Sequence, residues 1–316
     1  MTESGRAGLA STNNLLKEKL LRWMPQAGDY PTAVEGFTIF RRDEANQPEN
    51  CFYKPLAGVI VQGFKRSIIG SEEYRYGENH CLVTGVDVPS VNYITAASPE
   101  QPFLAVSLNL DNYLITQLAA EIPPSSKLGN GSYKGISIAK VDPDVLDAFL
   151  RLAELHEKPE QIPVLAPMII REIHYRLLIG PQGERLRMLN THGTQSNQIA
   201  RTITWLRDNY KEPLQVDELA RKVNMATSTF HRHFREVTTL SPLQFQKKLR
   251  LYEAQRLMLV ESEDAVIAGL AVGYESPTSV QQGIQEAVWR AATQACEPTE
   301  AAHAIGLLYP RPEISH

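Results

Sequence analysis

Residues 214–258 read LQVDELARKVNMATSTFHRHFREVTTLSPLQFQKKLRLYEAQRLM and decide how the C-terminal half is organised. Apolar residues recur there at the three- and four-residue spacing of amphipathic helices. They form two groups on either side of residues 224–226: Val216, Leu219 and Val223, then Phe230, Phe234 and Val237. Thr227, Ser228 or Thr229 can cap the second helix, and another helix is predicted before the pair, at 197–210. The pattern predicts a helix, a tight turn and a second helix.

The second helix of this pair carries polar side chains on its outward face. They are Thr227, Ser228, His231, Arg232 and Arg235. In a helix-turn-helix, such a helix lies in the DNA major groove with its N-terminal side chains at the base edges. Arg232 is the strongest candidate for reading a base, because its planar guanidinium matches two acceptors of guanine. The pattern alone leaves open that this is simply a basic, solvated helix.

Charge is unevenly spread along the chain, although the net charge is only −4. Residues 198–260 contain eleven Lys and Arg against six Asp and Glu, whereas the residues after 260 contain two against eight. A basic module between acidic ones is typical of a DNA-binding segment. No apolar run reaches the ~18 residues of a membrane helix, and no secretory signal is evident. We expect a cytoplasmic protein with no membrane partner.

The first half has a different pattern from the second. Short apolar runs broken by Gly, Pro, Ser and Asn fill residues 37–110, which predicts many short strands in a barrel or sandwich. Helical periodicity follows at 112–122, 144–156 and 164–178, and a short helix is predicted at 13–24. The length of 316 residues suggests two domains. We predict a first domain at 1–180, a linker at 181–196 and a helical domain from 197 onward.

Residues 214–258 resemble the first half of the DNA-binding domain of the AraC/XylS family of transcription regulators. DAVIAGLAVGYESP, at 264–277, resembles the start of its second half. The resemblance implies two helix-turn-helix units joined by a long helix, for which 242–260 is the expected connector. Such a helix spans about 28 Å, comparable with about 34 Å between successive major-groove faces. The implied DNA-binding residues of the second unit are Pro277, Thr278, Gln281 and Gln282.

The first half resembles the AraC-type regulatory N-terminal domain. The resemblance lies in LAGVIVQGFKRSIIGSEEYRYGENHCLVTGVDVPS at 56–90, ASPEQPFLAVSLNLD at 97–111 and PMIIREIHYRLLIGPQGERLRML at 167–189. It implies an α+β fold: a cupin-like β-barrel with helices, followed by an all-α double helix-turn-helix domain. It also implies a one-component regulator whose barrel senses a small-molecule inducer. The implied partners are double-stranded operator DNA, a second copy of the chain and RNA polymerase.

A cupin-type enzyme or small-molecule-binding protein with a vestigial DNA-binding half is the alternative function. Cupins are often metal enzymes, but His80 has no HxH pair and no following Glu at metal-ligand spacing. His156 and His174 lie in predicted helices. We therefore expect no metal, no cofactor and no catalytic residue. Cys81 is expected to be an inert core thiol, with a redox-sensing role as the alternative.

The family pattern breaks after Ser279, where the chain reads VQQGIQEAVWRAATQACEPTEAAHAIGLLYPRPEISH. One permitted back-translation of 280–293, read one nucleotide later, encodes FSREYKRLFGGPP, which resembles the missing end of the second unit. The sequence therefore predicts a frameshift near Ser279, with ordinary divergence as the alternative. The expected DNA-binding domain covers 197–292 with a disrupted second unit, and 293–316 is a tail outside the family pattern.

Overall fold

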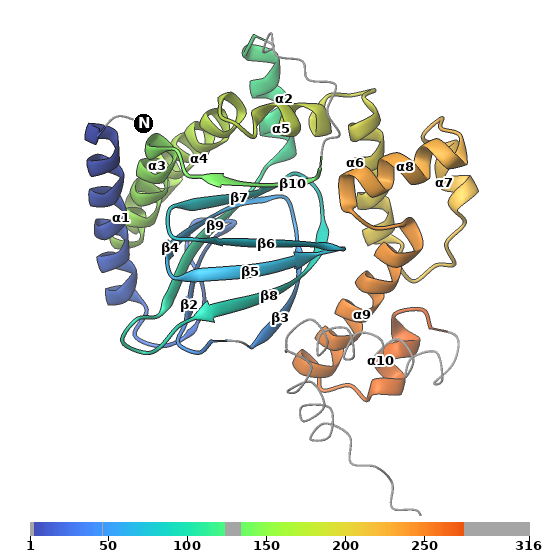
Figure 1. Ribbon diagram of the computed structural model, residues 1–316, viewed down its shortest axis with the longest axis horizontal. Coiled ribbons are helices and arrows are strands. Elements are labelled where there is room, and N and C mark those ends of the chain that lie inside the picture. The colour runs from blue at the N-terminus through green and yellow to red at the C-terminus, as the bar shows by residue number, and fades with distance from the viewer. Residues whose placement is uncertain (1–2, 46, 124–133, 275–316) are drawn as a thin grey trace, which may run out of the picture.

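The computed structural model describes residues 3–45, 47–123 and 134–274. Figure 1 shows a pair of β-sheets with one group of helices on one side and a second group, from α6 onward, on the other. The mixed fold, with strands in the first half and helices in the second, confirms the predicted fold class. The predicted residues Pro277, Thr278, Gln281 and Gln282, and the break after Ser279, lie outside the described residues.

Two antiparallel sheets form the N-terminal domain. One sheet has the strand order β1-β2-β9-β4-β7-β10 and the other β3-β8-β5-β6. The strands are β1 Gly28–Pro31, β2 Phe37–Arg42, β3 Pro48–Tyr53, β4 Leu56–Gln62, β5 Phe64–Ile69, β6 Glu72–Gly77, β7 His80–Thr84, β8 Val88–Ala96, β9 Phe103–Asn109 and β10 Ile136–Lys140. The strands predicted within 37–110 are confirmed. Alternating apolar residues in them determine which face of each strand is buried.

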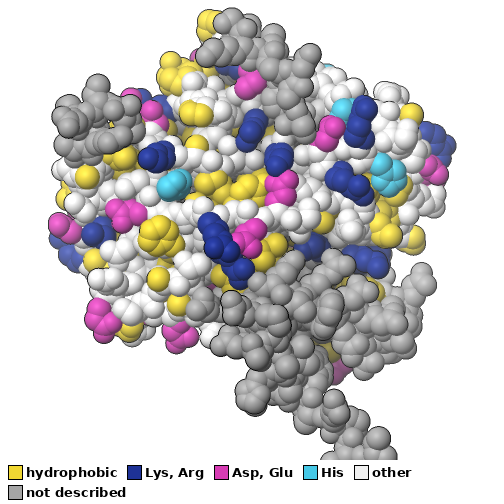
Figure 2. Space-filling model, viewed as in Figure 1, with side chains coloured by type: hydrophobic (Ala, Val, Ile, Leu, Met, Phe, Trp, Pro, Cys, Tyr) yellow, Lys and Arg dark blue, Asp and Glu magenta, His cyan; other side chains and the backbone are white. Residues whose placement is uncertain are grey.

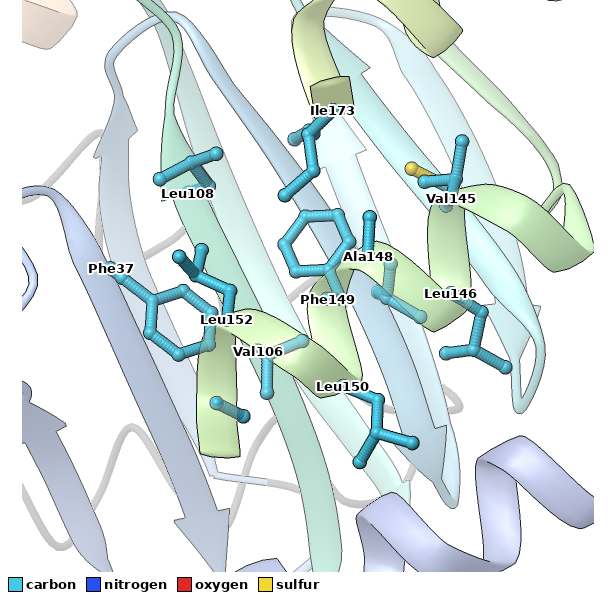
Figure 3. Close-up of a cluster of buried hydrophobic side chains, with 14 of the residues drawn as sticks. Phe37, Val106, Leu108, Val145, Leu146, Ala148, Phe149, Leu150, Leu152 and Ile173 are labelled. Atoms are coloured by element: carbon cyan, nitrogen blue, oxygen red, sulfur yellow. The ribbon is translucent and has the colours of Figure 1, made fainter. Parts of the chain in front are cut away.

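Helices cover the outer face of the six-stranded sheet (Figure 1). They are α1 Glu3–Trp23, α2 Asn112–Glu121, α3 Pro143–Glu154, α4 Ile162–Ile179 and α5 Gly183–Asn190, with two short 3₁₀ turns at Leu155–Glu157 and Pro159–Gln161. Figure 3 shows Phe149 and Leu152 of α3 packed toward Phe37 of β2 and Leu108 of β9. We call this buried cluster, which unites the sheet with α1 to α5, the first core.

The segment at 181–196 differs from the linker that its composition predicted. It contains the helix α5, which contacts α2, α4 and α6. Leu186 and Leu189 are both buried, and Leu186 belongs to the first core. Two apolar residues three apart are enough to attach one helical turn, although the surrounding Gly, Gln and Asn suggested a flexible connection. The two halves are therefore joined by packed structure.

The second group of helices follows the predicted order. It comprises α6 Gln195–Asp208, α7 Val216–Lys222, α8 Thr227–Thr238, α9 Pro242–Val260 and α10 Ala265–Ala271. Asn224, with φ of 54°, forms the tight turn between α7 and α8, a left-handed conformation that Asn tolerates better than most residues. A capping box of Ser241 and Gln244 starts α9. The connector helix predicted at 242–260 is confirmed.

The two halves share a second buried core. It contains Ile69, Val88 and Phe103 from the strands together with Phe230 and Phe234 from α8. Phe245 of α9 also belongs to it and meets both Phe52 of β3 and Phe234 edge to face, with ring centroids 5.6 Å apart in each pair. We call this cluster the shared core. Because it is continuous, the helices α6 to α9 are packed against the sheets.

Candidate nucleic-acid interface and ligand cavity

The outward face of α8 is open to solvent. Ser228, His231, Arg232 and Arg235 are exposed, and Thr227 is half-buried. Lys, Arg and His side chains gather over α7 and α8 at the right of Figure 2. The structure thus brings the five residues predicted for the first unit together on one helix. Their contact with DNA stays a prediction.

The start of α8 differs from the predicted cap. Ala226 occupies the capping position and no side chain accepts a hydrogen bond there. Instead, the Thr227 hydroxyl donates to Asp217 Oδ1 of α7 at 2.7 Å. This hydrogen bond links the start of α8 to the first turn of α7.

The other end of α8 is attached to the sheets. Gly135 N–H, just before β10, donates to the carbonyl of Val237 at 2.8 Å. The Thr239 hydroxyl, just after α8, donates to the carbonyl of Ile69 at the end of β5, at 3.1 Å. The apolar face of α8 is buried in the shared core. The sheets thus hold the C-terminal end of α8 and leave the outward face of its N-terminal half free.

Further basic side chains flank α8, and the sequence reasoning did not single them out. Lys222, at the end of α7, is exposed and its ammonium lies 4.3 Å from the ring centre of Trp205. Arg221 is exposed beside it. These charges extend the positive face beyond α8, as a surface that meets phosphates would require.

A cavity of about 900 Å³ lies between the sheets and reaches α9. Strand residues such as Phe40, Val59 and Phe103 line it on one side, and Tyr252 and Leu259 of α9 line it on the other. Because the lining combines nine strands with a helix far away in the sequence, no local pattern could have predicted this site. A molecule in the cavity would touch the connector helix directly.

A hydrogen-bonded cluster forms the polar part of the cavity wall. Lys65 Nζ donates to the Tyr53 hydroxyl at 2.9 Å, and that hydroxyl donates to Asn92 Oδ1 at 2.9 Å. Ser67 also donates to Asn92 Oδ1, at 2.7 Å. Burial raises the pKa of Tyr53 above its usual range, so the phenol stays protonated. Lys65 has no carboxylate partner among the described residues, and it therefore presents an uncompensated charge to the cavity.

The two described cysteines and the buried His174 have structural roles. Burial raises the pKa of Cys81 to about 12 and that of Cys51, in the cavity wall, to about 11, so both thiols are protonated at neutral pH. His174 accepts from Asp111 N–H at Nε2 and donates to the Ile170 carbonyl from Nδ1. Among the described residues no group of three or more His, Cys, Asp and Glu could hold a metal ion. No helix in this part of the chain is long and apolar enough to cross a membrane.

Two family models match the chain. Residues 33–185 match the AraC-type transcriptional regulator N-terminus, and residues 219–305 match a helix-turn-helix domain. The second match extends past Ser279, into the stretch for which a frameshift is predicted. That frameshift stays a prediction.

Curated relatives match mainly in the second half. The chain is 30% identical over 74 residues to the transcriptional activator RhaS of Pectobacterium carotovorum, a match that covers 23% of this chain and 26% of that protein. It is 25% identical over 131 residues to the transcriptional regulator GbdR of Pseudomonas aeruginosa, covering 42% of this chain and 35% of that protein. The chain thus spans only about a quarter to a third of the length of these relatives.

The fold extends the likeness to nearly the whole chain. The structure of ToxT from Vibrio cholerae with a bound unsaturated fatty acid superposes with a TM-score of 0.53 at 6% identity, over 83% of this chain and 93% of that one. At this identity the comparison shows the shared fold alone. The two family models account for both halves, in the order that the fold displays. The chain belongs to the AraC/XylS family of transcriptional regulators.

Proposed function

We propose that this protein is a transcription regulator that binds double-stranded DNA through the outward face of α8. The observation that carries the proposal is that Ser228, His231, Arg232 and Arg235 are exposed together on a helix whose opposite face is buried. A helix held in this way can enter the major groove without rearranging its own core. Arg232 then reads a base, while Arg235 and Thr227 lie nearer the phosphates.

Arg232→Ala tests this assignment directly. Binding sequences are first selected from randomised duplexes, both by the chain as given and by a version with the reading frame restored after Ser279. Arg232→Ala should cost ~1 to 3 kcal/mol on the selected duplex and relax the preference at one base pair. Arg235→Ala should weaken all sequences about equally and reduce the salt dependence. The matched control is Arg75→Ala, an exposed arginine on β6. Unchanged affinity and selectivity for Arg232→Ala would contradict the assignment.

The second unit is proposed to be impaired. Pro277, Thr278, Gln281 and Gln282 would begin its recognition helix, but the residues that follow depart from the family pattern and leave Arg290 as the one basic residue before 311. Fewer base and phosphate contacts mean weaker and less salt-dependent binding. The restored frame should bind the selected duplex orders of magnitude more tightly. Equal, nanomolar binding by both versions would show that the frameshift reading is wrong.

The cavity is proposed to bind a small apolar molecule with an anionic end. An apolar lining and the unpaired Lys65 ammonium support this, and the related fold of ToxT binds an unsaturated fatty acid. Oleate is a suitable probe for direct titration. Lys65→Met should weaken oleate binding about tenfold, since it removes a charge-assisted hydrogen bond. Lys140→Met, at the exposed end of β10, should change nothing. Equal oleate binding by both variants would contradict the proposal.

The remaining expectations concern the setting in which the regulator acts. A DNA-binding regulator works in the cytoplasm, and a homodimer with a contact to RNA polymerase is expected from the family. The alternative, a cupin-type enzyme with a vestigial DNA-binding half, requires a catalytic group in the first domain. Metal analysis of the purified full chain distinguishes the two, because stoichiometric transition metal would favour the enzyme.

A further inference from the structure

A second cavity lies at the junction of the two halves, apart from the one between the sheets. Its volume is about 510 Å³, within the range of small-molecule sites. The end of β9, the start of α2, the end of α5 and one face of α6 line it. The two cavities share Lys54 and Asn109 in their walls, whereas Arg201 and Thr204 of α6 belong to the junction cavity alone.

The charged groups of the junction cavity do not cancel. Its charged side chains are Lys54, Asp87, Arg201 and Arg207. Arg207 Nη1 lies 3.1 and 3.2 Å from the two carboxylate oxygens of Asp87, so these two charges compensate each other. Lys54 and Arg201 are exposed, and their side chains form no hydrogen bond or ion pair with the described residues. Two positive charges therefore remain for a ligand.

The uncharged lining is rich in hydrogen-bond acceptors. The Thr116 and Thr204 hydroxyls donate to carbonyls of their own helices, at 2.8 and 3.2 Å, and keep their lone pairs free. Asn197 Nδ2 donates to the Leu189 carbonyl at 2.9 Å, and Asn190 Nδ2 to that of Leu186 at 2.8 Å. Each of these side-chain amides has its oxygen left over for a donor. Hydroxyl groups of a ligand would find several acceptors there.

We infer that the junction cavity is a second ligand site, for a small phosphorylated polyol. A phosphate monoester carries nearly two negative charges at neutral pH, which matches the two uncompensated cations. Arginine and lysine bind phosphate oxygens through charge-assisted hydrogen bonds, and the acceptors nearby suit the hydroxyls of the polyol. An apolar acid would instead be placed in the cavity between the sheets.

The two cations lie on different halves of the molecule, so a ligand bound to both would link the halves. Lys54 lies between β3 and β4, whereas Arg201 lies on α6. A dianion held by both therefore adds an attraction between the sheets and the helices that include α8. Since binding to the folded state alone stabilises that state, the ligand should raise the melting temperature of the full chain.

Glucose 6-phosphate is the probe for this site, with glucose and inorganic phosphate as matched partial ligands. Titration calorimetry and thermal melts of the full chain are recorded without DNA, so the result does not depend on the proposed DNA binding. Glucose 6-phosphate should bind more tightly than phosphate, and glucose should not bind. Arg201→Ala should weaken glucose 6-phosphate about tenfold and abolish its effect on the melting temperature.

Two control variants separate the cavities and the kinds of phosphate. Lys65→Met, which lies in the other cavity, and Lys140→Met should keep the full response to glucose 6-phosphate. An undiminished response in Arg201→Ala would overturn the inference. So would a loss of DNA affinity in Arg201→Ala with its sugar-phosphate response intact, because Arg201 would then be a contact for DNA phosphates. Absence of any response in the unaltered chain would overturn it as well.

Discussion

The first core and the shared core are closed in different ways. The outer face of the six-stranded sheet is sealed by α1, α3 and α4, which precede the second group of helices in the chain. The shared core is sealed by α6, α8 and α9. The N-terminal domain can therefore complete its first core by itself, but its second buried surface needs the helices that carry the candidate DNA-binding face. A ligand between the sheets, as proposed, would contact a core to which both halves contribute.

The largest expected effects come from one phenylalanine in each core. Phe149→Ala and Phe245→Ala should each cost ~3 to 5 kcal/mol, because both side chains are fully buried and leave cavities. The two variants should destabilise different parts of the molecule. Hydrogen exchange should accelerate in α1, α3 and α4 for Phe149→Ala, and in α8, α9 and β3 for Phe245→Ala.

Denaturant unfolding and site-resolved hydrogen exchange check this pair. The conservative variants Phe149→Leu and Phe245→Leu should each lose less stability than the corresponding alanine variant. If both alanine variants loosened the same set of helices, the molecule would have one core, and the distinction between the two would fail.

A smaller effect is expected from the ion pair that crosses the junction. Arg207→Ala should cost about 2 kcal/mol, less than for a fully buried pair because Arg207 is partly exposed, and it leaves the carboxylate of Asp87 buried and unpaired. Burial already raises the pKa of Asp87 above its ordinary value of 3.8. Because the pKa of Asp87 is raised, the protonated carboxyl favours the folded state at low pH. This contribution to the free energy of unfolding is lost as the pH rises through the folded-state pKa.

The pH dependence makes this prediction specific. The cost of Arg207→Ala, measured by urea unfolding from pH 4 to pH 8, should shrink toward the acid end, where Asp87 is protonated. The double variant with Asp87→Asn should be more stable at neutral pH than Arg207→Ala alone. A cost that is independent of pH would mean that the pair does not hold the two halves together.

The helix cap of α9 should contribute less to stability than the core phenylalanines or the Asp87–Arg207 ion pair. Ser241→Ala removes the side chain that accepts from Gln244 N–H and should cost ~1 kcal/mol. Thr194→Ala, which removes the equivalent bond to Asn197 N–H at the start of α6, serves as the matched variant. Thermal melts measure both. A loss at Ser241 as large as that of Phe245→Ala would show that local capping, not the shared core, holds α9.

The smallest expected effect is a pH dependence in the first core. Burial lowers the pKa of His174 below its ordinary value of 6.5, and both ring nitrogens are engaged. A lowered pKa means that the stability it contributes is present above pH 6.5 and is lost as the pH falls through the folded-state pKa. His174→Gln should flatten the pH dependence of unfolding in this range. An equally steep dependence in the variant would assign the titration to another group.

Sequence reasoning predicted the helices of the second half well. The residues between Val216 and Val237 have strong periodicity, and α9 starts with a capping box and has the bounds that were expected. The outward face of α8 was also predicted, because the three- and four-residue spacing of apolar residues indicates which side of a helix is buried. The same reasoning missed α5, which is held by the buried residues Leu186 and Leu189. It also missed the start of α8, where Thr227 donates a hydrogen bond to Asp217 instead of capping the helix.

The sequence by itself determined which faces are buried, which helix offers a polar outward face and which family the chain resembles. Only the tertiary structure decided what the buried faces meet. Asp87 and Arg207, or Phe52 and Phe245, lie far apart in the chain and become neighbours only in the fold. Periodicity is a property of one helix or strand, whereas a cavity or an ion pair between halves depends on how several elements pack. The two cavities are therefore a product of the packing.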